Sequence, residues 1–135
     1  MRKTRTMLAG LAAGVATAAT LVMPGSANAA ASAPPPCPEK YVCFYTGSDY
    51  TGDMCMWSQA DPDWRNGNIK CSWSATKNVK SIKNNGTSSN WSGVAYYSGK
   101  DYGTRKGCTK QGKKGNLAGT YKLRSHRWIK GTCGS

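Results

Sequence analysis

The chain has 135 residues and a formal net charge of +13 at pH 7. Removal of the first 29 residues as a secretion signal leaves 106, which is enough for one domain and excludes a two-domain enzyme. These 106 residues hold 13 aromatic side chains but only eight Val, Ile or Leu. An all-helical bundle is therefore excluded, and short strands joined by tight turns are favoured.

Residues 1–29 have the three parts of a secretory signal peptide. A basic start at residues 1–5 precedes an uncharged apolar stretch at 7–22, and Ala27-Asn28-Ala29 supplies the small residues that a signal peptidase requires. The apolar stretch has 16 residues, fewer than the ~20 that a membrane-spanning helix needs. We therefore expect the signal to be removed, the protein to be secreted to the extracellular space, and no transmembrane segment.

Two kinds of segment follow the signal: a flexible leader and a single domain. Residues 30–36 (AASAPPP) are proline-rich and lack an apolar pattern, so they predict a flexible leader before a domain at 37–135. Residues 84–89 (NNGTSS) predict a linker between units at about 37–84 and 90–133, and residues 110–116 (KQGKKGN) predict a basic loop. Strands are predicted at residues 40–44, 78–83, 93–97, 120–123 and 127–129.

An internal repeat divides this domain into two halves. Residues 43–52 read CFYTGSDYTG and residues 95–103 read AYYSGKDYG. An aromatic-x6-Gly spacing joins Tyr45 to Gly52 in the first copy and Tyr96 to Gly103 in the second. The chain must fold back sharply at each copy, with glycine adopting a backbone angle that other residues resist. The repeat predicts two similar β units packed face to face.

All six cysteines follow the signal. Their even number in a small secreted chain predicts three disulfides, each contributing ~2–4 kcal/mol to stability. A zinc site is disfavoured because no Cys-x-x-Cys pair occurs and His126 is the only imidazole. Fifteen pairings are possible, and the sequence does not choose among them. The six are Cys37, Cys43, Cys55, Cys71, Cys108 and Cys133.

The charge is distributed unevenly along the chain. Residues 30–69 carry two basic and five acidic side chains, whereas residues 70–135 carry 14 Lys or Arg and only Asp101. Such a field attracts polyanions and acidic protein surfaces and speeds encounter with them. The alternative is that the basic half only keeps the protein in solution.

These residues resemble the βγ-crystallin Greek-key motif, which has an aromatic-x6-Gly turn early in each unit and a serine late in it. Ser81 and Ser125 would be the late serines. Within that superfamily, residues 37–45 (CPEKYVCFY) are similar to the start of secreted bacterial peptidase inhibitors, whose best-known member inhibits thermolysin-like metalloproteases. The resemblance covers about residues 37–133. It implies an all-β, disulfide-stabilised sandwich of two Greek keys with four strands each.

The resemblance also suggests a calcium site, because calcium binding is common among bacterial crystallin-like domains. That site takes two Asn/Asp, two spacers and then Ser/Thr-Ser, but residues 76–81 (TKNVKS) and 120–125 (TYKLRS) place Lys or Tyr at ligand positions. Because calcium requires oxygen ligands, we expect no metal site, and nothing in the sequence calls for another cofactor.

The chain offers too few catalytic groups for an enzyme. His126 is interpreted as a partly exposed strand residue, and Asp61 and Asp63 as a turn with solvated charges and not a catalytic pair. The tryptophans could form a carbohydrate- or base-stacking platform, but with so few aliphatic residues they are interpreted as core. Secretion makes nucleic acid an unexpected physiological partner. The five are Trp57, Trp64, Trp73, Trp91 and Trp128.

The first functional hypothesis is a secreted peptidase inhibitor that binds an extracellular protease through a rigid loop. Such a loop binds with little ordering cost and needs no catalytic residue. In the best-known relative the reactive bond follows a disulfide-held cysteine. The nearest candidate here is Gly107-Cys108-Thr109-Lys110, unless Cys108 merely joins two strands.

The competing hypothesis is a cationic envelope-binding or antimicrobial protein, similar in fold to crystallin-like killer toxins. Lys106, Lys110, Lys113 and Lys114 would then bind anionic cell-envelope polymers. Such binding should weaken steeply with added salt, because the screening length falls to ~8 Å at physiological ionic strength.

Overall fold

The computed structural model describes residues 33–133, apart from the side chain of Thr120. The predicted signal and the first part of the leader lie outside the described residues, so these expectations stay predictions. Residues 33–36 form no regular secondary structure. No helix in the described range has the length and apolar character to cross a membrane.

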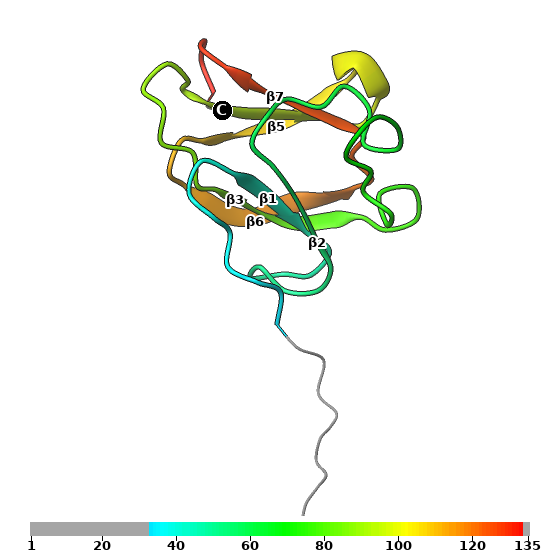
Figure 1. Cartoon of the computed structure of the whole chain (residues 1–135). Helices are drawn as coiled ribbons and strands as arrows, with labels where there is room; N and C mark the ends of the chain where they lie inside the picture. Colours follow the sequence, from blue (N-terminus) through cyan, green and yellow to red (C-terminus); the bar gives the residue numbers. More distant parts are fainter. Residues whose placement is uncertain (1–32, 134–135) are drawn as a thin grey trace, which may run out of the picture. The chain divides into compact units, whose positions relative to one another are not determined.

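Seven strands form two antiparallel sheets, which confirms the all-β class. The sheets lie as two layers, with β1, β2, β3 and β6 in one and β5 and β7 in the other (Figure 1). The strand orders are β2-β1-β3-β6 and β5-β4-β7. The elements are β1 (Val42–Tyr45), β2 (Met54–Trp57), β3 (Val79–Asn84), β4 (Gly93–Tyr97), the 3-10 turn η2 (Lys100–Tyr102), β5 (Arg105–Lys110), β6 (Lys114–Tyr121) and β7 (Ser125–Ile129).

The basic loop predicted at residues 110–116 is shorter than expected and comprises residues 111–113. The turn between β5 and β6 is closed by the amide of Lys113, which donates to the carbonyl of Lys110 (3.0 Å), and β6 begins at the next residue. β6 extends because its backbone pairs with β3, a distant contact that the local glycine-rich composition does not reveal. The predicted strand at 120–123 is correspondingly the end of β6, which stops at Tyr121.

The expectation of four strands in each Greek key is wrong for the first unit, which has three within the described residues, so the second sheet has three strands as well. β6 crosses into the first sheet and pairs with β3. The matching position beside β7 holds only an isolated bridge between Asp61 and His126. A strand does not continue there because Pro62 has no N–H to donate and Asp61 accepts the amide of Asp63 in a local turn (2.9 Å).

The two repeated turns superpose with a register one residue away from the predicted one. Tyr45 pairs with Ser81, and Tyr97, not Tyr96, pairs with Ser125. Tyr45 packs against Tyr50 with ring centroids 5.8 Å apart, and Tyr97 packs against Tyr102 at 5.6 Å. The prediction that Tyr96 is the equivalent of Tyr45 in the second copy of the repeat is therefore wrong. The sequence was ambiguous here because two tyrosines are adjacent.

This shift changes which residue stands at the special backbone position. Gly52 has φ 82°, and its counterpart seven residues after Tyr97 is Thr104 with φ 58°. Gly103 has φ −89°, an ordinary value. The second turn thus places a β-branched residue in the left-handed region, where the first turn has glycine.

The late serines close both turns in the same way. The Ser81 hydroxyl donates to the carbonyl of Gly47 (2.7 Å) and accepts from the amide of Tyr50 (2.9 Å). The Ser125 hydroxyl donates to the carbonyl of Gly99 (2.6 Å) and accepts from the amide of Tyr102 (3.2 Å). Each buried hydroxyl therefore bonds to one backbone N–H and one backbone carbonyl of its turn, which makes few hydrogen bonds to a neighbouring strand.

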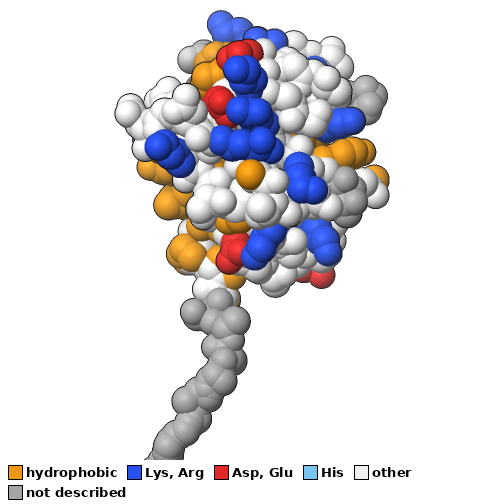
Figure 2. Space-filling model, turned by 90° about the vertical axis from the view of Figure 1, so that its right-hand side faces the viewer, with side chains coloured by type: hydrophobic (Ala, Val, Ile, Leu, Met, Phe, Trp, Pro, Cys, Tyr) orange, Lys and Arg blue, Asp and Glu red, His pale blue; other side chains and the backbone are white. Residues whose placement is uncertain are grey.

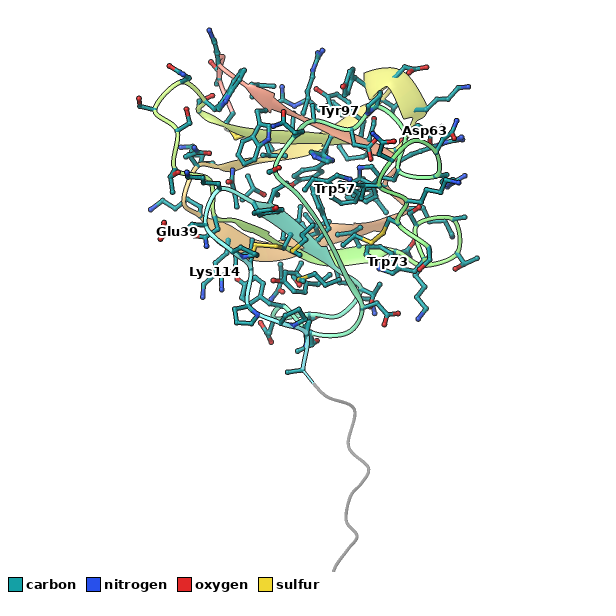
Figure 3. The ribbon with its side chains drawn as sticks, viewed as in Figure 1. Glu39, Trp57, Asp63, Trp73, Tyr97 and Lys114 are labelled. Atoms are coloured by element: carbon teal, nitrogen blue, oxygen red, sulfur yellow. A yellow bond between two sulfur atoms is a disulfide. The ribbon has the colours of Figure 1, made fainter. Side chains whose placement is uncertain are left out.

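Aromatic rings fill the space between the sheets. Phe44 is fully buried and contacts Trp57, Trp64 and Tyr96, with ring centroids 4.7–6.1 Å apart. Figure 3 shows Trp57 between the two layers. The interpretation of the tryptophans as core is confirmed for Trp57, Trp64 and Trp73, all buried. It is wrong for Trp91, which is 36% exposed, and incomplete for Trp128, which is half-buried.

His126 is fully buried, so the prediction of a partly exposed residue is wrong. The loop after β2 covers it: Trp64 Nε1 donates to His126 Nδ1 (2.9 Å), and His126 Nε2 lies 2.9 Å from the carbonyl oxygen of Gln59. The imidazole is therefore neutral, with its proton on Nε2. Burial lowers the pKa of His126 to about 4.

The prediction of three disulfides is confirmed, and each cysteine pairs with its neighbour in sequence. Cys37–Cys43 ties the start of the domain to β1, and Cys55–Cys71 ties β2 to the end of the loop that follows it. Cys108–Cys133 ties β5 to the segment after β7. None of the described cysteines is free.

Candidate functional site

The predicted inhibitory residues, Gly107 to Lys110, lie in β5 and not in a loop. Among residues 33–133, β5 is at the edge of its sheet and pairs with β4 alone. An antiparallel edge strand turns the N–H and C=O of every second residue away from the sheet. The segment is thus already extended and has backbone groups available for another chain.

A disulfide and two glycine contacts hold this strand in place. Cys108 is bonded to the buried Cys133, and the two sulfurs lie against Gly93 of β4, where a Cβ would clash with both. Gly107 lies against the ring of Tyr96, where a Cβ would come within 2.6–2.8 Å of the ring and hydroxyl. Burial raises the pKa of the Tyr96 hydroxyl, so this support stays uncharged at neutral pH.

The C-terminal end of β5 is also anchored. The side-chain amide of the buried Asn84 donates to the carbonyl of Thr109 (2.9 Å), and the amide of Gln111 donates to the carbonyl of Ser92 (2.9 Å). Asn84 belongs to β3, so this bond joins the two sheets directly beside the candidate segment. A strand fixed at both ends loses little conformational freedom when a partner binds it.

Two open cavities flank Cys108, and Tyr96 and Cys108 line both. One has a volume of about 390 Å³ and includes Lys110, Lys113 and Lys114, and the other has about 620 Å³ and includes Arg105 and Lys106. No Asp or Glu lines either cavity. Cys108 therefore lies between two cavities that are lined by cationic side chains.

The cations of this surface are not neutralised by carboxylates. The ion pairs of residues 33–133 are Lys77–Asp53 and Arg124–Asp63, and neither involves β5 or β6. Lys106 Nζ lies 5.1 Å from the ring centroid of Tyr121, and Lys114 Nζ lies 5.0 Å from that of Tyr50. Another face also carries a column of Lys and Arg side chains with few acidic ones (Figure 2). The structure thus places the four predicted anion-binding lysines along β5, the turn that follows it and the start of β6.

Sequence reasoning missed a second protruding segment, residues 58–70, which is closed by Cys55–Cys71. Its turn at Asn66, Gly67 and Asn68 is exposed, and the next residue, Ile69, is 49% exposed. The available signal was the pair of cysteines, whose connectivity was open. The segment is held down by the buried Trp64 and lines a cavity of about 570 Å³.

The aspartates at the base of this segment serve the fold. Asp63 accepts two hydrogen bonds from Arg124 (2.9 and 3.1 Å), which hold its pKa below the usual range. Asp61 accepts from Trp57 Nε1 (2.9 Å), and partial burial raises its pKa. Figure 3 shows Asp63 at the edge of the molecule, away from Lys114. Both carboxylates are therefore engaged in structural bonds.

The sequence was compared with models of known protein families. A model of peptidase inhibitor family I36 matches residues 30–109, more than half of the chain. The chain belongs to peptidase inhibitor family I36. The match includes the first repeat, β4 and most of β5, up to Thr109. A search of curated proteins found no significant match.

Family I36 membership supports a peptidase-inhibiting role and a protease as partner. It also agrees with the small inventory of catalytic groups, since an inhibitor works by binding.

Proposed function

We propose that this protein is a secreted inhibitor that binds an extracellular protease through β5, with Gly107 to Lys110 as the contact segment. The observation that carries the proposal is the family I36 match, which extends through Cys108 and Thr109. The edge position of β5 supports the segment, because a protease cleft binds an extended chain through backbone hydrogen bonds.

The mechanism follows from how β5 is held. Its backbone is extended before binding, so the protease does not have to order it. Cys108–Cys133, the Gly107–Tyr96 contact and the Asn84 bond resist displacement of the segment once it is bound. The unpaired cations beside Cys108 would favour a protease whose cleft rim is acidic, and they would speed the encounter.

The test is a titration of the oxidised, signal-free protein against a thermolysin-like, a subtilisin-like and a papain-like protease. We expect stoichiometric inhibition of at least one, with the thermolysin-like enzyme as the first candidate from the resemblance. Absence of inhibition of all three at micromolar protein would contradict the proposal.

Two variants locate the contact. Thr109→Pro removes a backbone donor from β5 and should weaken inhibition on the order of a hundredfold, because a lost buried hydrogen bond and a misplaced strand act together. Ile69→Ala alters the other disulfide-closed segment and is the matched control. Loss of inhibition in Ile69→Ala with retention in Thr109→Pro would move the contact to residues 58–70.

A second candidate function is binding of anionic cell-envelope polymers. The observation that favours it is the cavity formed by Lys110, Lys113 and Lys114, which contains no carboxylate. Lys113→Glu with Lys114→Glu should abolish binding to envelope preparations, and wild-type binding should fall steeply between low and high salt. Binding that is equal at both salt concentrations would exclude this function.

A further inference from the structure

Two tryptophans that are more exposed than those of the aromatic core line one cavity. Trp91 belongs to the segment before β4, and Trp128 belongs to β7. Trp91 is 36% exposed, whereas Trp57 and Trp64 are at most 1% exposed. The cavity has a volume of about 270 Å³ and is separate from the two beside Cys108. Trp128 also packs against the core, and both rings line the cavity, where they present apolar surface to a small ligand.

The Trp128 ring is held in a fixed position. Its Nε1 donates to the carbonyl of Ser58 (3.2 Å). On the other side the ring lies on Gly86, where a Cβ would come within 2.6 Å of a ring carbon. This glycine is therefore required by the close approach of the ring. A wall built in this way is preorganised and does not have to be ordered by a ligand.

Gln111 supplies the polar part of the cavity wall. Its Nε2 donates to the carbonyl of Ser88 (2.8 Å), which fixes the orientation of the side-chain amide. Its Oε1 is buried and accepts no hydrogen bond within the described residues. A buried acceptor without a donor is costly, so a ligand hydroxyl that donates to Oε1 would be favoured when the Gln111 side chain gives up its bond to Ser88 and turns Oε1 from Gly86 toward the cavity.

The charges around the cavity have one sign. Lys40 lines it, and Lys130 Nζ lies 5.7 Å from the centroid of the Trp91 ring. No Asp or Glu lines the cavity. A ligand with a negative group is therefore favoured over a neutral one of the same shape.

We propose that this cavity binds an acidic pyranose unit of an extracellular polysaccharide. The C–H face of the sugar would lie on Trp91 and Trp128, a hydroxyl would reach Gln111, and the carboxylate would face Lys40. The cavity is smaller than typical sites for drug-sized molecules, which suits one sugar ring. Aromatic grooves also bind proline-rich peptides, but a neutral peptide would leave the lysines without a partner.

The experiment is a titration of the oxidised protein, followed by tryptophan fluorescence and calorimetry. The probe is a hyaluronan hexasaccharide, which alternates a uronic acid with N-acetylglucosamine, and chitohexaose is the neutral comparison. We expect saturable binding of the hyaluronan fragment and at least ~10-fold weaker binding of chitohexaose. Trp91→Ala should weaken binding by on the order of tenfold or more, and Trp91→Tyr should retain most of it.

Two controls separate this site from general attraction to polyanions and from protease inhibition. Met56→Ala removes another exposed apolar side chain, 37% exposed, and should leave binding unchanged. Binding of polyglutamate and inhibition of the protease should both be unaffected by Trp91→Ala, because Trp91 lines neither cavity beside Cys108.

Four results would overturn the proposal. These are no binding of the hyaluronan fragment at millimolar concentration, equal binding of chitohexaose, hyaluronan binding that survives Trp91→Ala, and stronger binding of a proline-rich peptide than of either sugar. Near-ultraviolet circular dichroism verifies that each variant is folded. If Trp91→Ala is not folded, Lys40→Ala replaces it, with the same loss of hyaluronan binding expected.

Discussion

The two hairpins of this protein share one backbone plan but differ in chemistry. The first hairpin comprises residues 42–57 and the second comprises residues 93–110. Both have a tyrosine pair across the turn, a serine that closes it, and an edge strand that ends the sheet. The edge strand of the first hairpin reads MCMW, and that of the second reads RKGCTK. The edge strand of the first hairpin thus supplies Trp57 to the core, and that of the second supplies a charged surface.

This difference indicates which edge strand is available to bind a partner. Trp57 at the end of β2 is buried, so its edge strand is committed to the core, and the loop after it is tied back through Cys55–Cys71. β5 has no fully buried residue, and its disulfide leads to the chain end after β7. β5 therefore has more exposed positions, Arg105, Lys106 and Lys110, whose side chains can change without loss of core packing, whereas β2 has one, Met56.

The largest expected contrast concerns the disulfides of the two halves. Loss of Cys108–Cys133, in the double variant Cys108→Ala, Cys133→Ala, should lower the free energy of unfolding by about 3.5 kcal/mol. Loss of Cys37–Cys43 should cost about 2.5 kcal/mol, because its sequence separation is 6 instead of 25. Urea unfolding measures both values.

The two disulfide variants should differ more in protease inhibition than in free energy of unfolding. Under conditions where both variants remain folded, only the one lacking Cys108–Cys133 should lose inhibition. Equal inhibition by the two variants would remove β5 from the proposed mechanism.

The next contrast is the pair Ile82 and His126, which occupy the same place in the two halves. Ile82 pairs with Phe44 and His126 pairs with Tyr96. The folded-state pKa of His126 is lowered to about 4, whereas an unfolded histidine titrates near ~6.5. The unfolded chain therefore binds a proton first, and stability should fall by about 3 kcal/mol as the pH decreases from ~6.5 to about 4.

Urea unfolding at pH 7, 6, 5 and 4 checks this window. His126→Ile, which copies the first half, should remove the slope between pH 6.5 and 4. It should also cost stability at pH 7, because the Trp64 indole N–H loses its acceptor. A slope that persists in His126→Ile would assign the pH dependence to other groups.

The two turn-closing serines should be equivalent in energy. Ser81→Ala and Ser125→Ala each remove one donated and one accepted hydrogen bond at a buried site. Each should lower the free energy of unfolding by about 2 kcal/mol. Chemical denaturation measures the loss in each variant. A negligible loss of unfolding free energy in either variant would contradict the equivalence of the two serines.

The smallest expected effect lies at the special backbone position of each turn. Thr104→Gly should stabilise the protein by about 0.5 kcal/mol, since relief of the left-handed strain outweighs the entropy that glycine adds to the unfolded chain. Gly52→Ala should destabilise it, because a Cβ there meets Thr46 and the backbone of Gly47. An increase in melting temperature for Gly52→Ala would show that the two positions are not counterparts.

The sequence by itself determined the local features of this protein. Aromatic and β-branched residues with glycine turns specified the β class, and β4 was predicted at its observed bounds, because strand propensity and turn chemistry act over a few residues. The cysteine count specified three disulfides but not their pairing. The sequence predicted a loop at Gly107 to Lys110, whereas the structure has these residues in β5.

Only the tertiary structure decided the features that depend on distant contacts. β6 became a strand because β3 lies beside it, and His126 became buried because Trp64 and Gln59 cover it from another loop. Tyr96 and Tyr97 could exchange roles in the sequence, and the pairing of Tyr97 with Ser125 chose between them. Burial, register and the greater exposure of Trp91 and Trp128 are set by packing between segments far apart in the chain. No pattern within one segment contains that information.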